Sequence, residues 1–252
     1  DGLEATNDRF RGKRGAFREA LQGIHNCREA GLRVGLRFTI TRHNYREVGD
    51  IFRLLEEEDI PRCCFYHLVY AGRGSKLIEE DVSQQEARQV MDLVFAKAQE
   101  FHRRGLDKEI LTVDNHSDAV YLYRQVQREQ PQRAAEVLRL LEWNGGNRSG
   151  QGISSVDNLG YVHADQFWQH YSFGNVRERP FGEIWEDTSD PLMAGLKRKK
   201  EMVKGRCHSC HYLDLCAGNL RVRAEAVYGD VWAPDPACYL TDSEIGVEEQ
   251  GT

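Results

Sequence analysis

The 252-residue sequence lacks the features that mark several large classes of protein. It has no apolar run close to the roughly 20 residues that span a bilayer, and no signal segment with an apolar core. Basic residues are not in excess, since the net charge is −6, whereas nucleic-acid-binding domains usually carry clustered lysine and arginine. These absences predict a cytoplasmic protein that binds neither membranes nor nucleic acids.

Several cofactor-binding and catalytic motifs are also missing. No Gly-x-Gly-x-x-Gly sequence and no phosphate-binding loop is present, which argues against a nucleotide-binding doubly wound domain. No Gly-x-Ser-x-Gly elbow and no Ser–His–Asp arrangement is apparent, so hydrolase chemistry is not expected. The sequence by itself identifies no catalytic residue.

Helical and strand patterns alternate through the first part of the chain. Apolar residues recur at three- and four-residue intervals over residues 16–30 and 48–55, which predicts amphipathic helices. Residues 32–41 alternate apolar with polar side chains and favour a strand, and residues 63–70 are expected to form a second strand. Cys63 and Cys64 are adjacent on the second of these strands, so their side chains should point to opposite faces.

A capping box at Ser83 and Glu86 begins a further long helix, so the order is helix, strand, helix, strand, helix. Such an order predicts an α/β fold with parallel strands and helical crossovers, as in a barrel or a doubly wound sheet. Two strands cannot close a barrel, and the chain begins at Asp1 without an initiator methionine. We therefore expect a chain whose upstream part is missing.

The pattern changes after residue 105. Shorter elements are expected there: helices at 116–127, 132–143, 179–185 and 190–202, and a hairpin at 153–162. The basic run at 197–200 is expected at a solvated helix end, and the acidic tail at 243–252 is expected to fray. These changes divide the chain into domains at residues 1–108 and 109–252.

Four of the seven cysteines lie close together near the C-terminal end: Cys207, Cys210, Cys216 and Cys238. A Cys-x-x-Cys turn aims two thiolates at one site, and the other two cysteines complete a four-thiolate shell. From the spacing alone, both a structural zinc ion and an iron–sulfur cluster fit. The neighbouring histidines are expected to be surface residues, because four cysteines suffice.

The spacing Cys207-x2-Cys210-x5-Cys216, with Cys238 further on, resembles the second auxiliary-cluster motif of SPASM domains, which follow radical S-adenosylmethionine (SAM) barrels. Residues 1–2, 7–12, 174–176 and 183–185 resemble other motifs of this family in the same order. The resemblance implies the C-terminal part of a radical SAM partial (β/α) barrel at 1–108, followed by a small SPASM-like iron–sulfur domain. The four cysteines would then hold a [4Fe-4S] auxiliary cluster.

Within the family, residues 112–116, 141–147, 156–160 and 162–168 resemble the branch that works in heme d1 biosynthesis. This resemblance implies a siroheme-derived tetrapyrrole substrate, didecarboxysiroheme, from which two propionate side chains are removed. SAM, a second [4Fe-4S] cluster in the full-length enzyme, and an electron donor such as flavodoxin or ferredoxin are also implied. The alternatives are a SPASM-type peptide-modifying enzyme and a non-catalytic zinc-binding module.

The sequence departs from the family pattern at the first auxiliary cluster. Ser154, Ser155, Asp165 and Leu220 stand where its cysteine ligands are expected, so we predict a single auxiliary cluster that transfers electrons. The Cys-x3-Cys-x2-Cys motif of the SAM-cleaving cluster does not occur in the 252 residues. The chain alone is therefore expected to be inactive.

Three further residues are candidates by the same resemblance. Arg11 is similar to an arginine that pairs with the SAM carboxylate, although a solvated basic loop would look the same. His116 and His163 lie in the heme-specific stretches and could bind the iron tetrapyrrole. The alternative is that these two histidines make structural hydrogen bonds.

Overall fold

The computed structural model describes residues 1–247, which form two compact units. The sheet unit comprises Asp1–Leu68 and Ile78–Asn115, and the cysteine unit comprises Val69–Leu77 and the residues from His116 onward. The sequence analysis expected a domain boundary after residue 108, and the division between the compact units falls after Asn115. In the described residues no helix is long and apolar enough to cross a bilayer.

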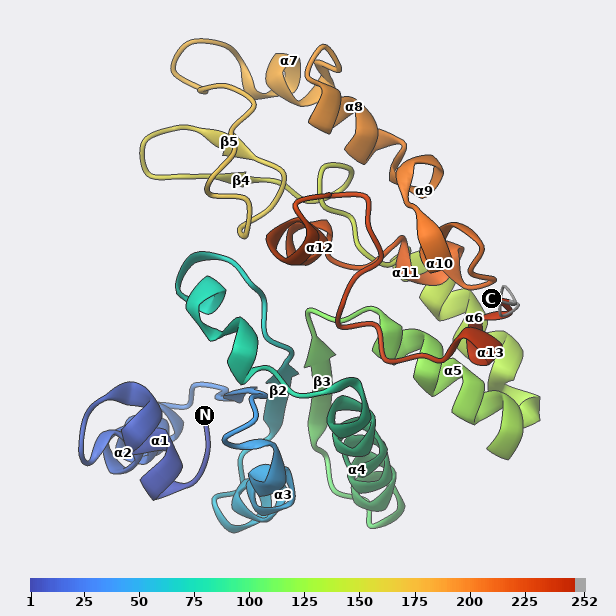
Figure 1. The fold of residues 1–252 in the computed structure, drawn as a ribbon. Coiled ribbons are helices and arrows are strands. Elements are labelled where there is room, and N and C mark those ends of the chain that lie inside the picture. Colours follow the sequence, from blue (N-terminus) through green and yellow to red (C-terminus); the bar gives the residue numbers. More distant parts are fainter. Residues whose placement is uncertain (248–252) are drawn as a thin grey trace. The chain divides into compact units, whose positions relative to one another are not determined.

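The sheet unit contains a three-stranded parallel sheet in the order β1-β2-β3, with helices between the strands (Figure 1). Its elements are α1 (Glu4–Arg11), α2 (Ala16–Glu29), β1 (Leu36–Thr39), η1 (Tyr45–Glu47), α3 (Val48–Glu57), β2 (Arg62–Tyr66), α4 (Gln84–Arg103) and β3 (Glu109–Val113). The capping box of Ser83 and Glu86 begins α4 as predicted. A short 3-10 segment, η2 (Gly72–Glu80), lies where the chain passes between the units.

Strand β3 was not predicted from the sequence. Its residues pair with β2 in parallel register, with Cys63 beside Ile110 and Phe65 beside Thr112. All five of its residues are only half-buried, so the strand lacks the alternation that marks the other two. Because β3 belongs to the sheet, the sheet unit extends to Asn115.

Four phenylalanines form the centre of the sheet unit. The Phe65 ring on β2 lies 5.8 Å from Phe38 on β1 and 5.3 Å from Phe52 on α3. The Phe52 ring also lies 5.5 Å from Phe101 on α4, so α3 and α4 cover the same face of the sheet. Sequential parallel strands with both crossover helices on one face are the arrangement of a (β/α) barrel wall, not of a doubly wound sheet. Cys63 is buried while Cys64 is half-buried, in line with opposite faces.

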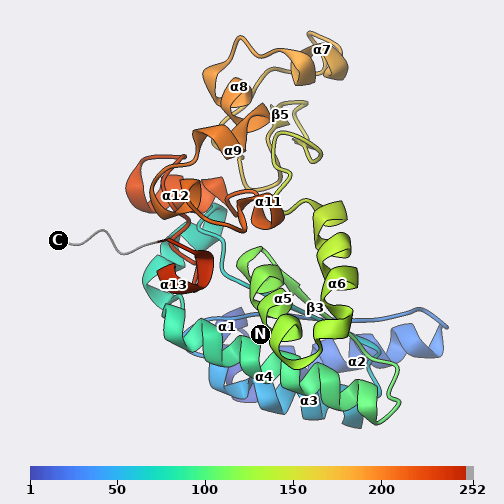
Figure 2. The same cartoon turned by 90° about the vertical axis from the view of Figure 1, so that its right-hand side faces the viewer.

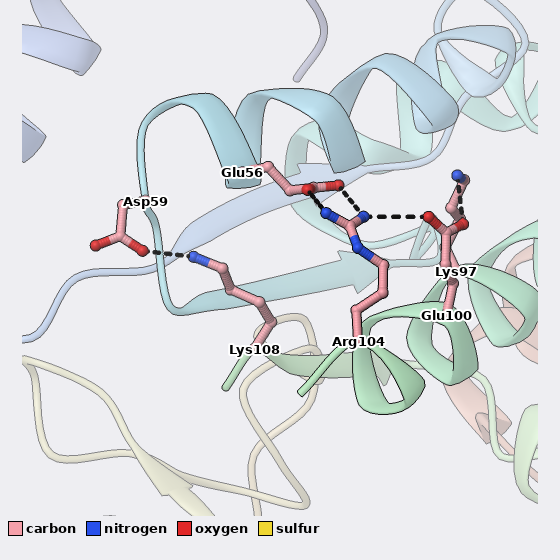
Figure 3. Close-up of polar contacts among 6 residues, drawn as sticks. All are labelled: Glu56, Asp59, Lys97, Glu100, Arg104 and Lys108. Carbon is pink, nitrogen blue, oxygen red and sulfur yellow. Dashed lines mark hydrogen bonds and ion pairs between the residues drawn. The ribbon is translucent and has the colours of Figure 1, made fainter. Parts of the chain in front are cut away.

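Exposed ion pairs join the ends of α3 and α4 (Figure 3). The Arg104 guanidinium contacts the carboxylates of Glu56 and Glu100, and Lys108 Nζ lies 2.8 Å from Asp59 Oδ1. Hydrogen bonding from Arg104 lowers the pKa of Glu56. Such solvated pairs contribute little to stability, so the phenylalanine layer carries most of the packing.

In its described residues, the cysteine unit combines two helices of 13 and 14 residues with a series of shorter helices and one small hairpin (Figure 2). Its elements are α5 (Ser117–Glu129), α6 (Pro131–Asn144), β4 (Ser155–Val156), β5 (Val162–His163), α7 (Phe181–Glu186), α8 (Pro191–Lys197), α9 (Lys199–Met202), α10 (Gly205–His208), α11 (Leu213–Cys216), α12 (Arg221–Tyr228) and α13 (Asp242–Ile245). The predicted hairpin is confirmed, since β4 and β5 pair antiparallel. Trp168, fully buried, packs in its core with Leu196 and Val222.

Two expectations for this unit were wrong. Lys199, in the basic run expected to be solvated, is fully buried, and its ammonium group donates to the Asn147 carbonyl and side-chain oxygens and to Ser149 O. The expected frayed tail instead begins with α13, which Thr241 and Glu244 cap reciprocally. Residues 248–252 of that tail lie outside the described part of the chain.

Candidate metal centre

All four C-terminal cysteines line one cavity in the cysteine unit. Cys207 lies on α10, Cys216 ends α11, and Cys210 lies in the turn between them. Cys238 comes from the loop between α12 and α13. The cavity is also lined by Asp235 and by Arg206, Ser117 and Asn219. The fold thus joins the distant cysteine to the three that are close in sequence.

Three of the four sulfur atoms accept a backbone hydrogen bond from the residue two positions further on. Tyr212 N–H donates to Cys210 Sγ over 3.3 Å. Gly218 and Leu240 donate in the same way to Cys216 and to Cys238. Hydrogen bonds of this kind stabilise thiolates and tune the potential of iron–sulfur clusters. The repeated geometry therefore suits metal-bound sulfur.

Burial raises the pKa of three of the thiols that line the cavity. Burial raises the pKa of Cys216 and of Cys238 to about 12, and it raises the pKa of Cys210 as well. Protein charge alone therefore does not ionise these sulfurs, although the nearby Arg206 lowers the pKa of Cys210 and Cys238. A bound metal supplies the positive charge that deprotonates such thiols.

The two metals that the sequence left open need different arrangements of the four sulfur atoms. In the described residues, no group of three or more histidine, cysteine or acidic side chains is arranged to hold a single ion. A tetrahedral zinc ion needs all four sulfurs at about 2.3 Å from one centre. A four-iron cluster instead binds each thiolate at a different iron.

The turn after Cys216 is held in an unusual conformation. Ala217, Gly218 and Asn219 all have positive φ angles of 51°, 77° and 60°. Gly146, at φ +67°, packs so closely that a Cβ there would lie 2.4 Å from the Cys216 carbonyl carbon. Asn147 N–H also donates to Cys216 O over 3.1 Å. Residues 144–150 are rich in glycine and asparagine, but no sequence signal connects them with the cysteines.

His116 and His163 lie in different surroundings within the cysteine unit. His116 precedes α5, and its backbone N–H donates to Asn219 Oδ1 over 2.9 Å. Burial, aided by the positive charge of Lys199, lowers the pKa of His116 to about 4, so its imidazole is neutral at pH 7. His163 on β5 is 2% exposed, and its Nδ1 lies 2.7 Å from Tyr171 O. That contact is typical of a structural histidine.

Arg11 lies on α1 in the sheet unit. Its guanidinium is half-exposed and lies 2.8 Å from the carboxylate of Asp1. The two residues line a cavity together with Asn7 and Lys13. Arg11 is therefore already paired with a carboxylate, that of Asp1, whereas the sequence predicted a pair with the carboxylate of SAM.

The residues that stand in place of the expected cysteines of the first auxiliary cluster make other contacts in this chain. The Ser154 and Ser155 hydroxyls donate to the carbonyls of His163 and Asp165, each over 2.9 Å. Leu220 is buried, and its backbone N–H donates to Asp235 Oδ2. Burial raises the pKa of the Asp165 carboxyl group.

The fold matches that of radical SAM enzymes. Over 91% of its length, the chain superimposes on SuiB from Streptococcus suis bound to S-adenosylmethionine, with a TM-score of 0.62 and 17% identity, covering 50% of that chain. At this identity the likeness concerns the fold alone. No protein-family model matches the sequence.

Two relatives are similar at the level of sequence. Fe-coproporphyrin III synthase from Methanosarcina barkeri is 61% identical over 99% of this chain and 63% of its own length. Pre-heme d1 synthase from Dinoroseobacter shibae is 44% identical over 98% of this chain and 61% of its own length. The chain is therefore similar in sequence to enzymes of heme synthesis, in line with the resemblance to the radical SAM family that its motifs indicated. It spans about three fifths of the length of these two relatives.

Proposed function

We propose that this chain is part of a radical SAM enzyme that acts on an iron-containing tetrapyrrole and forms Fe-coproporphyrin III. The observation that carries the proposal is the 61% identity to Fe-coproporphyrin III synthase, which extends through both units. The second candidate is the synthesis of pre-heme d1 by loss of two propionate side chains from didecarboxysiroheme. It is supported by the 44% identity to pre-heme d1 synthase and by the heme-specific stretches. Peptide modification has weaker support: the chain is 26% identical over 99% of its length to PqqA peptide cyclase from Gluconobacter oxydans, and its fold is similar to that of SuiB bound to a precursor peptide.

We also propose that Cys207, Cys210, Cys216 and Cys238 hold one [4Fe-4S] auxiliary cluster in a SPASM-like domain. The shared cavity, the repeated N–H···S bonds and the four-thiolate donor set support this assignment. When bound, the cluster would supply one-electron transfer, because four thiolates leave no iron open to substrate. A donor such as flavodoxin or ferredoxin would provide the electrons.

The SAM-dependent step is assigned to the full-length enzyme. The 252 residues contain no Cys-x3-Cys-x2-Cys motif, so we expect this chain alone not to cleave SAM. Arg11 is the proposed contact for the SAM carboxylate, provided that it exchanges its Asp1 partner.

Of the two histidines, His116 is the better candidate for contact with the substrate. Its neutral imidazole is the form that binds iron, and its side chain is not fully enclosed. His163 has its Nδ1 occupied by a backbone carbonyl and its Nε2 lies 3.5 Å from Asp157. We therefore assign His163 to the support of the hairpin.

The metal assignment is tested by anaerobic purification of the chain, with measurement of iron, sulfide, zinc and visible absorption. We expect about four irons and four sulfides per chain. We expect this content to be lost in Cys238→Ser and retained in Cys27→Ser, a cysteine outside the site. A colourless chain with one zinc and no sulfide would contradict the cluster assignment.

The substrate assignment is tested with the full-length enzyme, SAM, a reductant and didecarboxysiroheme. Mass spectrometry of the product distinguishes Fe-coproporphyrin III from a tetrapyrrole that has lost propionates. If neither product forms while SAM is still cleaved, both tetrapyrrole candidates are contradicted. In the same assay, His116→Ala should weaken substrate binding more than His163→Gln does.

A further inference from the structure

A fully buried ion pair lies beside the cysteine cavity. Arg223 on α12 donates from Nε to Asp235 Oδ1 over 2.9 Å and from Nη2 to Oδ2 over 3.2 Å. Both side chains are 0% exposed. Two parallel hydrogen bonds of this kind fix the orientation of the carboxylate as well as its charge.

The carboxylate of Asp235 also connects two separate parts of the cysteine site. Its Oδ2 accepts the Leu220 N–H over 2.9 Å, just beyond the turn that follows Cys216. Its Oδ1 accepts the Ala237 N–H over 2.9 Å, and its backbone carbonyl accepts the Cys238 N–H over 3.1 Å. One side chain therefore ties the segment of the third cysteine to the loop of the fourth.

A second buried arginine reinforces this connection. Arg221 is 1% exposed and donates to the carbonyls of Val231 and Ala233, which precede Asp235 in the loop. Its other terminal nitrogen donates to Gly218 O, within the turn after Cys216. The loop that carries Cys238 is thus bound to the Cys216 turn by two arginines and one aspartate.

We propose that Asp235, oriented by Arg223, is a positioning residue that places Cys238 beside the other three cysteines before any metal binds. The inference rests on the proposed role of the four cysteines as ligands of one cluster. Cys238 lies 22 residues beyond Cys216, and a loop of that length does not fix its own geometry. Residues that orient ligands in this way typically affect metal affinity by about 10- to 100-fold.

The test compares Asp235→Asn with a matched control in the same loop. Asp235→Asn keeps the size of the side chain but removes the charge that Arg223 requires. The control is Asp230→Asn, which breaks the exposed ion pair between Asp230 and Lys204. Asp230 also accepts a backbone N–H, from Trp232, so the two variants differ mainly in burial and in their link to the Cys216 turn.

Two measurements separate positioning from general stabilisation. In the metal-free chain, the alkylation rates of Cys238 and Cys207 by iodoacetamide are measured by mass spectrometry. We expect Asp235→Asn to raise the Cys238 rate selectively, while Asp230→Asn leaves both rates unchanged. After anaerobic reconstitution, Asp235→Asn should retain iron and sulfide about 10- to 100-fold less tightly against a chelator, with an altered midpoint potential.

Equal acceleration of both thiols, or a cluster with unchanged retention and potential, would overturn the proposal. If Asp235→Asn does not fold, Arg223→Lys is measured in the same way, since lysine keeps the charge but cannot make both hydrogen bonds. A wild-type chain that binds no iron and sulfide would instead contradict the proposed cluster. The alkylation contrast would still decide whether Asp235 positions Cys238.

Discussion

The two units of this chain place their charged residues in opposite ways. In the described residues of the sheet unit, the buried polar residues are asparagine, threonine and histidine, and each ion pair keeps at least one partner accessible to solvent. Among its residues up to 247, the cysteine unit buries six charged residues: Asp118, Asp165, Lys199, Arg221, Arg223 and Asp235. The sheet unit is thus organised by apolar packing, whereas buried polar contacts define the loops of the cysteine unit.

This difference follows from the elements available to each unit. The sheet unit has a regular sheet, and a 20-residue helix shields one face of it, so apolar layers suffice. Several helices of the cysteine unit have only four residues and cannot define a position by themselves. Hydrogen bonds from buried charged groups are directional, and they fix backbone segments that apolar contacts would leave free to slide.

The largest effect on stability is expected from Phe65→Ala in the sheet unit. Phe65 is fully buried between Phe38 and Phe52, so truncation should lower the free energy of unfolding by about 3–5 kcal/mol. Urea denaturation followed by circular dichroism measures the loss. The alkylation rates of the four C-terminal thiols should not change at low urea. A selective change at those thiols would show that the contrast between the units is wrong.

A smaller loss of stability, with a specific effect on the metal site, is expected from Gly146→Ala. The new Cβ would meet the Cys216 carbonyl at 2.4 Å, at a φ that alanine rarely adopts. Strain and overpacking of this kind cost about 1–3 kcal/mol. Iron and sulfide content should fall together with stability. Gly182→Ala, where nothing lies within 4 Å, is the control and should leave both unchanged.

A pH-dependent effect is expected from Lys199. Burial lowers the pKa of Lys199 from 10.5 to about 7. Between these values the unfolded chain binds a proton that the folded chain does not, so this group makes stability rise as pH increases. Below pH 7 Lys199 is protonated in both states, so the free-energy cost of burying its charge is fully present. Comparison with Lys199→Met isolates this contribution.

The measurement is the melting temperature of the metal-free chain and of Lys199→Met from about pH 6 to about pH 9. The wild-type chain should gain stability relative to the variant above pH 7. The missing hydrogen bonds to Asn147 shift the whole variant curve but not its slope. Parallel curves would mean that Lys199 titrates normally and that its burial has no electrostatic consequence.

The smallest effect is expected from Glu56→Gln at the surface of the sheet unit. The variant weakens the contact with Arg104, but water already solvates both groups (Figure 3). The midpoint of urea denaturation should be unchanged within error. A clear loss of stability would show that the sheet unit, too, depends on its ion pairs.

The amino-acid sequence by itself determined the local features of this protein. The periodicity of residues 16–30 and the capping box at Ser83 predicted α2 and the start of α4, because both depend on side chains within one or two turns. The spacing of Cys207, Cys210 and Cys216 likewise predicted a shared site. The ordered motifs indicated a resemblance to radical SAM enzymes of heme synthesis, and two relatives similar in sequence are heme-synthesis enzymes.

Only the tertiary structure decided the features that depend on contacts between distant segments. The basic run at 197–200 looks solvated in sequence, yet Lys199 is buried against Asn147 and Ser149, about 50 residues away. Nothing in the sequence indicates that Gly146 touches Cys216 or that Asp235 holds two cysteine segments together. Burial and hydrogen-bond partners are set by which segments pack together, and local periodicity contains no record of that choice.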